Sequence, residues 1–403
     1  SGISTLGTTS FTADATVNGV TVGKGANSVA SNTVVGNLAL DANTTGVRNA
    51  AFGQGALTEN TTGNDNSAFG YYVLDAVTTG SENTAMGRSA AGSITTGSSN
   101  TAIGKYSLLN NETASYNTAV GAGSLQSSTT GASNVAIGYN SLYANTTAAN
   151  NTAVGMQCME DNTTGADNTS VGHLALANNT TANNNTAVGK GALQTNTTGA
   201  NNVALGYNAL NDNTTATGNT GLGYNSLALN TTGEANVAVG NLALDANTTG
   251  ASNTAVGKDA LRANTTADSN TAVGHDAATA LTTGGYNVAL GDSALIASTT
   301  GVNNVAIGYQ TLNNSTDKFA NVAIGYRACK NNNSNYGVFI GDRAASNGIV
   351  GGEKNVSVGH YSLFSLTTGT NNVSVGANAL DANTSGAENT AMGSSALSLS
   401  LIH

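Results

Sequence analysis

NTAVGKGALQTNTTGAN, residues 185–201, is one complete copy of a repeat that fills most of this chain of 403 residues. A second copy starts directly after it at Asn202, so that Gly206 follows Gly189 by 17 residues. In the unit, Asn is followed by Thr or Val, Ala, an aliphatic residue and Gly. Two variable residues, Ala or Ser, and Leu come next, often with Asn-Thr-Thr-Gly further on. Such regular repetition indicates one structural element copied along the chain.

Glycines keep this spacing from Gly36 to Gly325. The rhythm changes once, where Gly341 comes one residue early and Gly359 one residue late, and then it returns. These glycines mark 22 units. An Asn stands four residues before each of them except Gly341, where Gly337 takes its place.

The period of the repeat predicts its fold class. Seventeen residues are too few for the helix-pair repeats, which need roughly 33 to 47. Frequent Gly and β-branched residues also disfavour helix. We therefore expect an all-β protein, a β-solenoid or β-roll of about 22 rungs, each rising about 4.8 Å. Residues 1–31 would form N-terminal lead-in or cap strands and residues 32–403 the solenoid, with irregular rungs at about 317–358.

Composition and charge exclude several other classes of protein. Charged residues make up only 8% of the chain, against roughly 25% in average globular domains, but the regular Val, Ile, Leu and Thr argue against disorder. The net charge is −10 and no basic run occurs, so nucleic acid is not an expected partner. No apolar run reaches the roughly 20 residues of a membrane span, so no membrane insertion is expected in this segment.

Stacked units turn each position of the repeat into a column along the solenoid. We expect the columns that hold Asn185, Gly189, Leu193, Asn202, Gly206 and Leu210 to form its structural ladder. The Gly would occupy a corner with positive φ or close backbone approach. The Asn side chains would bond amide to amide above and below, and Leu would fill the core.

The strand before the glycine suggests a partner. In Thr-Ala-Val, adjacent side chains point to opposite faces, so either choice of the inner residue leaves an apolar column outside. We expect the small Ala column to face another copy of the chain, with these interface candidates: Ala119, Ala136, Ala153, Ala187 and Ala204. A long exposed apolar stripe favours self-association, most simply as a parallel homotrimer.

Several segments resemble known repeats. NVAIGYNSL (134–142), NTAVGKDAL (253–261) and YGVFIGDRA (336–344) are similar to the head repeats of YadA-type trimeric autotransporter adhesins. The 17-residue form with Asn-Thr-Thr-Gly resembles β-solenoid repeats of phage tail-fibre-like proteins, which often precede an endosialidase-type intramolecular chaperone. The resemblance implies a trimeric fibre for cell adhesion or surface attachment, located extracellularly, on a cell surface or on a virion. Adhesin head repeats are shorter than these.

Candidate recognition residues lie where the rhythm fails. The position after the repeat glycine carries Tyr, His and Lys, which is typical of a solvent face and could also offer rings and cations to a sugar. Five candidates stand in or beside the irregular units: Tyr326, Arg327, Lys330, Arg343 and Lys354. A loop extension near Ala345–Glu353 would present them to a cell-surface receptor or glycan. A repeat decayed by drift is the equal alternative.

No catalytic, cofactor-binding or metal-binding residues are expected. The sequence has no plausible triad, no HExxH and no paired-carboxylate signature, and His173 and His275, six rungs apart, cannot share a metal ion. Cys158 and Cys329 are ten rungs apart, too far for a disulfide, and we expect both to be small buried hydrophobic residues.

The sequence thus predicts a non-enzymatic structural fibre, the shaft or head of an adhesin or phage tail fibre. A self-assembling filament of solenoids stacked end to end is the alternative, because the last rung at Leu399–His403 has no cap. Ice binding by Thr columns is a weaker alternative, since adjacent Thr residues would point to opposite faces.

Overall fold

A computed structural model describes residues 14–398 of the chain. They fall into two compact units, one ending at Lys190 and the other starting at Gly191. Each unit is a β-solenoid with about 17 residues in a turn, and the chain has about 21 turns in all. The predicted all-β solenoid is therefore confirmed. Leu399–His403, on which the end-to-end alternative depends, lie outside the described residues.

The first unit begins with a hairpin and a short 3₁₀ helix and continues with one three-residue strand in each turn. Its elements are β1 (Ala15–Val17), β2 (Val20–Gly23), η1 (Ala26–Ser28), β3 (Thr33–Val35), β4 (Ala50–Phe52), β5 (Ser67–Phe69), β6 (Thr84–Met86), β7 (Thr101–Ile103), β8 (Thr118–Val120), β9 (Val135–Ile137), β10 (Thr152–Val154), β11 (Thr169–Val171) and β12 (Thr186–Val188).

The second unit consists of the same turn without a hairpin. Its strands are β13 (Val203–Leu205), β14 (Thr220–Leu222), β15 (Val237–Val239), β16 (Thr254–Val256), β17 (Thr271–Val273), β18 (Val288–Leu290), β19 (Val305–Ile307), β20 (Val322–Ile324), β21 (Val338–Ile340), β22 (Val356–Val358), β23 (Val373–Val375) and β24 (Thr390–Met392).

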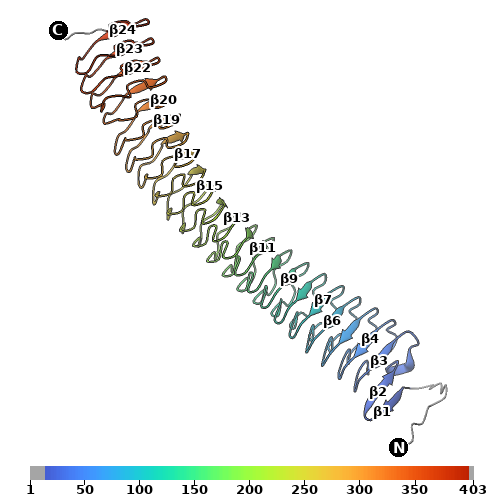
Figure 1. Ribbon diagram of the computed structural model, residues 1–403. Coiled ribbons are helices and arrows are strands. Elements are labelled where there is room, and N and C mark those ends of the chain that lie inside the picture. The colour runs from blue at the N-terminus through green and yellow to red at the C-terminus, as the bar shows by residue number, and fades with distance from the viewer. Residues whose placement is uncertain (1–13, 399–403) are drawn as a thin grey trace, which may run out of the picture. The chain divides into compact units, whose positions relative to one another are not determined.

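Within each unit, neighbouring solenoid strands pair in parallel and in register. Thr118 lies opposite Val135 in the first unit, for example, and Val237 opposite Thr254 in the second. Figure 1 shows these short strands side by side within each unit. Because the offset equals the repeat length, residues of one repeat position stack directly on one another.

The hairpin joins the first turn by antiparallel pairing. β1 pairs with β2, and β2 pairs with β3 through Val22 opposite Val35. The carboxylate of Asp14 accepts the backbone N–H groups of Lys24 and Gly25, at 2.6 and 2.8 Å. The part of the predicted lead-in that the structure describes therefore forms strands that lie on the end of the first unit.

The repeat glycine makes the corner after each strand. Gly240 has φ of +138°, and a Cβ there would lie 2.5 Å from the carbonyl oxygen of Gly257 in the next turn. Both the dihedral angle and the close approach require glycine at this corner. The sequence-based explanation of the glycine column agrees with this geometry.

Three residues other than glycine also adopt left-handed backbone in a typical turn. After Gly104 they are Tyr106, Leu108 and Tyr116, with φ of 61°, 51° and 65°. This conformation costs roughly 1–2 kcal/mol for a residue with a Cβ. Full burial of the Leu side chain offsets that cost, since it contributes about 1.5–3 kcal/mol. The sequence placed Leu in the core but gave no sign of its backbone conformation.

The predicted direction of the strand side chains is wrong. Ala119, Ala136, Ala153, Ala187 and Ala204 are all fully buried inside their turns, so they cannot form the expected interface. The middle residue of each three-residue strand points inward, and the residues on either side of it point out. The narrow interior explains the choice, because Ala shares it with the Leu column and a larger side chain would not fit in most turns.

The irregular turns do not form the protruding loop expected near Ala345–Glu353. Val350 is fully buried and forms a parallel bridge with Asn332 in the preceding turn. Two residues are added before Val350 and one is lost after it, so the turn of 18 residues that starts at Gly341 keeps its core. Only single side chains project, among them Ile349, which is 69% exposed.

Candidate recognition surface

The predicted ladder residues lie in the interior and at the corners of the turns. Leu193 and Leu210 are fully buried, and Gly189 and Gly206 have φ of +133° and +139°. The backbone N–H of Asn185 donates to Oδ1 of Asn168 at 2.9 Å. These placements make the three columns parts of one hydrogen-bonded and packed framework.

The Asn column before the glycine bonds chiefly to backbone groups. Oδ1 of Asn202 accepts the backbone N–H of Asn219 at 2.9 Å, and its Nδ2 donates to the carbonyl of Ala216 at 2.9 Å. Direct amide-to-amide bonds also occur, as from Asn100 to Asn83 at 3.0 Å. Each buried side chain thus ties its turn to the one above, which satisfies polar groups that would be costly to leave unpaired.

A second Asn column, from the Asn-Thr-Thr-Gly segment, forms an amide ladder that the sequence analysis missed. Nδ2 of Asn230 donates to Oδ1 of Asn213 at 3.0 Å, and Asn247 donates to Asn230 at 2.8 Å. These side chains are fully buried. The fixed 17-residue recurrence of this Asn was the signal available in the sequence.

The two Thr residues of that segment differ in exposure. The hydroxyl of Thr248 is half-buried and donates to the carbonyl of Thr265 in the next turn at 3.0 Å, whereas Thr249 is exposed. The first Thr column therefore serves the stacking of turns. One exposed Thr column remains of the array that the ice-binding alternative requires.

The outer face of the strands carries an apolar stripe in each unit. Its members flank the buried middle residue, and Ile137, Leu205 and Leu290 are 39%, 46% and 43% exposed. Val237 and Val239 of β15 are half-buried in the same way. We call this surface the apolar strand face. It takes the place of the Ala column as the outward apolar stripe.

Cations and aromatic rings gather on the irregular turns of the second unit. The rings of Tyr309 and Tyr326 stack with centroids 5.4 Å apart. The Arg327 guanidinium lies 5.1 Å from the Tyr326 centroid, and that of Arg343 lies 5.4 Å from Tyr326 and 5.5 Å from Tyr361. Arg343 Nη1 also donates to the Tyr361 hydroxyl, which raises the pKa of the guanidinium. Such contacts hold the two Arg side chains over the rings.

A hollow of about 230 Å³ lies beside these rings, and we call it the basic hollow. It is lined by Arg327, Lys330, Asn331, Arg343, Ser346, Asn347 and Phe364. The structure thus brings together four of the five recognition candidates, three in the lining and Tyr326 against both Arg side chains. Lys354 lies elsewhere, at the corner before β22, where its backbone N–H donates to Asn335.

Sequence reasoning missed Tyr361 and Phe364 in this cluster. Both could have been found by counting from the repeat glycine. Tyr361 follows Gly359 by two residues, as Arg343 follows Gly341, and Phe364 occupies the same place as Ser346. The late Gly359 hid this correspondence, because the count had to restart there.

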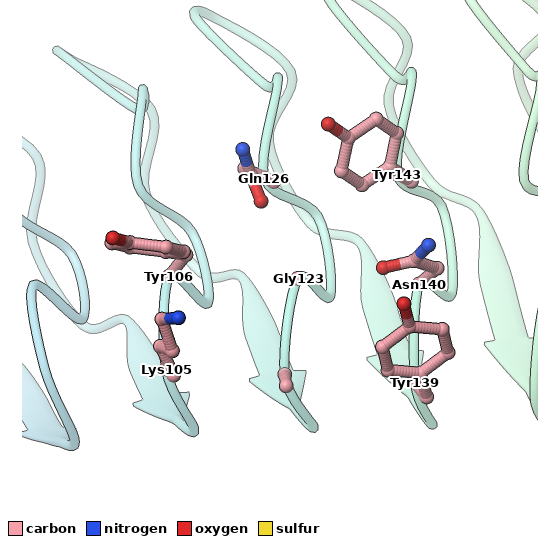
Figure 2. Close-up of a pocket in the computed structure, with 8 residues that line it drawn as sticks. Lys105, Tyr106, Gly123, Gln126, Tyr139, Asn140 and Tyr143 are labelled. Atoms are coloured by element: carbon pink, nitrogen blue, oxygen red, sulfur yellow. The ribbon is translucent and has the colours of Figure 1, made fainter.

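A second hollow, of about 300 Å³, lies on the first unit. Figure 2 shows its walls on two turns, with a gap above Gly123 on the turn between. The lining residues are Lys105, Tyr106, Ala122, Gly123, Gln126, Tyr139, Asn140 and Tyr143. The Lys105 ammonium lies 4.7 Å from the Tyr106 centroid. The small Ala122 and Gly123 create this gap, since the turns on both sides carry bulky residues.

The two cysteines are free thiols inside the turns. Burial raises the pKa of Cys158 to about 11, although a contact with Ser170 at 2.9 Å acts in the opposite direction. Burial also raises the pKa of Cys329. Thiols in such surroundings are poor nucleophiles at neutral pH.

Residues 14–398 contain neither a metal-ligand cluster nor a membrane-spanning helix. In this range no three His, Cys, Asp or Glu side chains are grouped so that they could hold a metal ion. No helix among these residues has the length and apolar character that crossing a membrane requires.

Comparison of the chain with protein-family models, with curated proteins and with solved structures finds no match.

Proposed function

We propose that this chain is a non-enzymatic structural fibre protein that associates with copies of itself through the apolar strand face. In this proposal it forms the shaft or head of an adhesin or tail fibre, as a parallel homotrimer, and attaches to a receptor or glycan outside the cell. The supporting observation is the apolar strand face, which recurs on every turn of both units.

The regular spacing of this face favours a second copy as the partner. Side chains such as Val239, Val256 and Val273 recur at each turn, so a partner must repeat at the same interval to cover them. Another copy of the chain does so by construction, and closed symmetry is the commonest solution for such contacts. The number of three subunits comes from the resemblance to adhesin heads alone.

The proposal is tested by the mass of the protein in solution. We expect sedimentation equilibrium of the full chain to give three times the chain mass of 39.7 kDa. Replacing Val239, Val256 and Val273 together by Lys should give monomers, because three buried charges at an interface cost far more than the contacts gain.

A matched control places the same charges on another side of the same turns. Thr232, Thr249 and Thr266 are exposed, and their joint replacement by Lys should leave the trimer intact. A stable monomer of the unaltered chain at micromolar concentration would overturn the proposal. Mass that rises without limit as concentration increases would favour the end-to-end filament instead.

A further inference from the structure

We propose that the basic hollow on the second unit binds an acidic sugar, with the anionic group of the sugar held by Arg327, Lys330 and Arg343. This deepens the proposed attachment function and rests on it for the source of the ligand, a surface polysaccharide. The hollow itself is argued from the contacts within the second unit.

Charge is the first reason. Three cationic side chains line the hollow and no carboxylate does. Among residues 14–398, Arg327, Lys330 and Arg343 form no salt bridge, whereas Arg48 pairs with Asp65 and Lys258 with Asp259. Like charges held close together repel, so an anion between them is favoured.

The neighbouring acid does not neutralise this charge. Asp342 follows the corner glycine and directly precedes Arg343, but its Oδ2 lies 3.6 Å from Nε2 of His360. It is not part of the lining. The positive hollow is therefore a local exception on a chain whose net charge is −10.

Preorganisation is the second reason. Nε of Arg327 donates to Oε1 of Gln310 at 3.0 Å, and its guanidinium lies against the stacked Tyr309 and Tyr326 rings. Arg343 lies between Tyr326 and Tyr361. Side chains held in this way lose less conformational entropy when they bind a ligand.

Shape and lining favour a sugar ring over a bare ion. Ser346 is the small residue between Lys330 and Phe364 on successive turns, and it leaves the space that forms the hollow. Phe364 offers an apolar wall for the C–H face of a ring, and Asn331 and Asn347 offer amides for hydroxyl groups. Pockets for drug-sized ligands measure about 300–1,000 Å³, so 230 Å³ suits a single sugar unit.

The test measures binding of three probes to the full chain by calorimetry at constant ionic strength. Glucuronic acid carries the charge and the ring, glucose the ring alone, and inorganic sulfate the charge alone. We expect glucuronic acid to bind at least ten times more tightly than either of the others. Raising the salt concentration should weaken its binding, because the charges lie at the surface.

Variants locate the site. Arg343→Gln should weaken the binding of glucuronic acid about tenfold, which corresponds to about 1.4 kcal/mol. Lys330→Gln should weaken it less, since Lys offers a point charge in place of a planar fork. Arg88→Gln is the matched control, because Arg88 lies over the Tyr106 ring at 5.7 Å on the first unit and the change in net charge is the same.

Four results would overturn the proposal. Equal affinity for glucose would show that the cations play no part, and equal affinity for sulfate that the ring plays none. An unchanged affinity in Arg343→Gln would place binding elsewhere, and an equal loss in Arg88→Gln would show a general effect of net charge. The Val-to-Lys variant of the apolar strand face should keep its affinity for glucuronic acid, so failure of self-association and failure of sugar binding are distinguishable.

Discussion

Gly337 and Phe339 fill complementary space inside one turn of the second unit. Phe339 is fully buried at a position where most turns have Ala, and Gly337 stands where every other unit has Asn. A Cβ on Gly337 would overlap the edge of the Phe339 ring. The backbone N–H of Gly337 still donates to Oδ1 of Asn321 at 2.9 Å, so the ladder continues without the missing amide. The ring thus replaces the volume of the Asn side chain.

This pair predicts strong coupling between two substitutions. Phe339→Ala should destabilise the second unit by about 3–5 kcal/mol, the usual cost of a large cavity. Gly337→Asn alone should also destabilise it, because the new side chain meets the ring. Together they restore the common pattern, and urea unfolding should show a smaller loss than the sum of the single changes. Simple additivity would mean that the two residues do not share space.

The Asn column predicts a large effect from one buried amide. Oδ1 of Asn134 accepts the N–H of Asn151 at 3.0 Å and its Nδ2 donates to the carbonyl of Ala148 at 2.9 Å. Asn134→Ala should cost about 1–3 kcal/mol for each buried group left unpaired. Hydrogen exchange should become faster first in the turns on either side of the substitution. The exposed Asn110→Ala is the control, and equal protection in both variants would refute the bonding role.

The corner glycine predicts a contrast with another glycine of positive φ. Gly240→Ala should unfold the turns around it, because the Cβ would press on Gly257. Gly218 has φ of +70°, and a Cβ at this position would have no other atom within 4 Å. Other units place Asn or Ser there, so Gly218→Asn should change the thermal midpoint by little. Circular dichroism melting of both variants checks this, and similar midpoints would contradict the close-approach argument.

The buried Cys158 thiol predicts a dependence of stability on alkaline pH. Its pKa is raised to about 11 from an ordinary 9.0 by burial, so the folded state holds the proton more tightly than the unfolded state. Stability from this group is complete below pH 9 and is lost as the pH rises to about 11. Two pKa units correspond to about 2.7 kcal/mol. Unfolding between pH 8 and 11 should show a smaller decline in Cys158→Ala, and parallel declines would refute the role of the thiol.

The candidate site could be predicted in part. Composition alone pointed to Tyr326, Arg327, Lys330 and Arg343, because cations are scarce in the rest of the chain. Their convergence around Ser346 depends on how the turns of 16 and 18 residues stack. The absence of Lys354 from the group has the same origin, since that residue lies at a corner on a different part of the turn.

The sequence by itself determined the period, the solenoid and the columns of Asn, Gly and Leu, since a fixed repeat forces equivalent residues into equivalent places. Only the tertiary structure decided which strand residues point inward. In a strand of three residues such as Thr186–Val188, Ala and Val are both apolar, so alternation alone cannot assign the faces. The closed turn makes the choice, because its narrow interior accepts Ala187 beside the Leu column and leaves the larger Val outside. The left-handed backbone of Leu likewise follows from closing the turn, against the local preference of the residue.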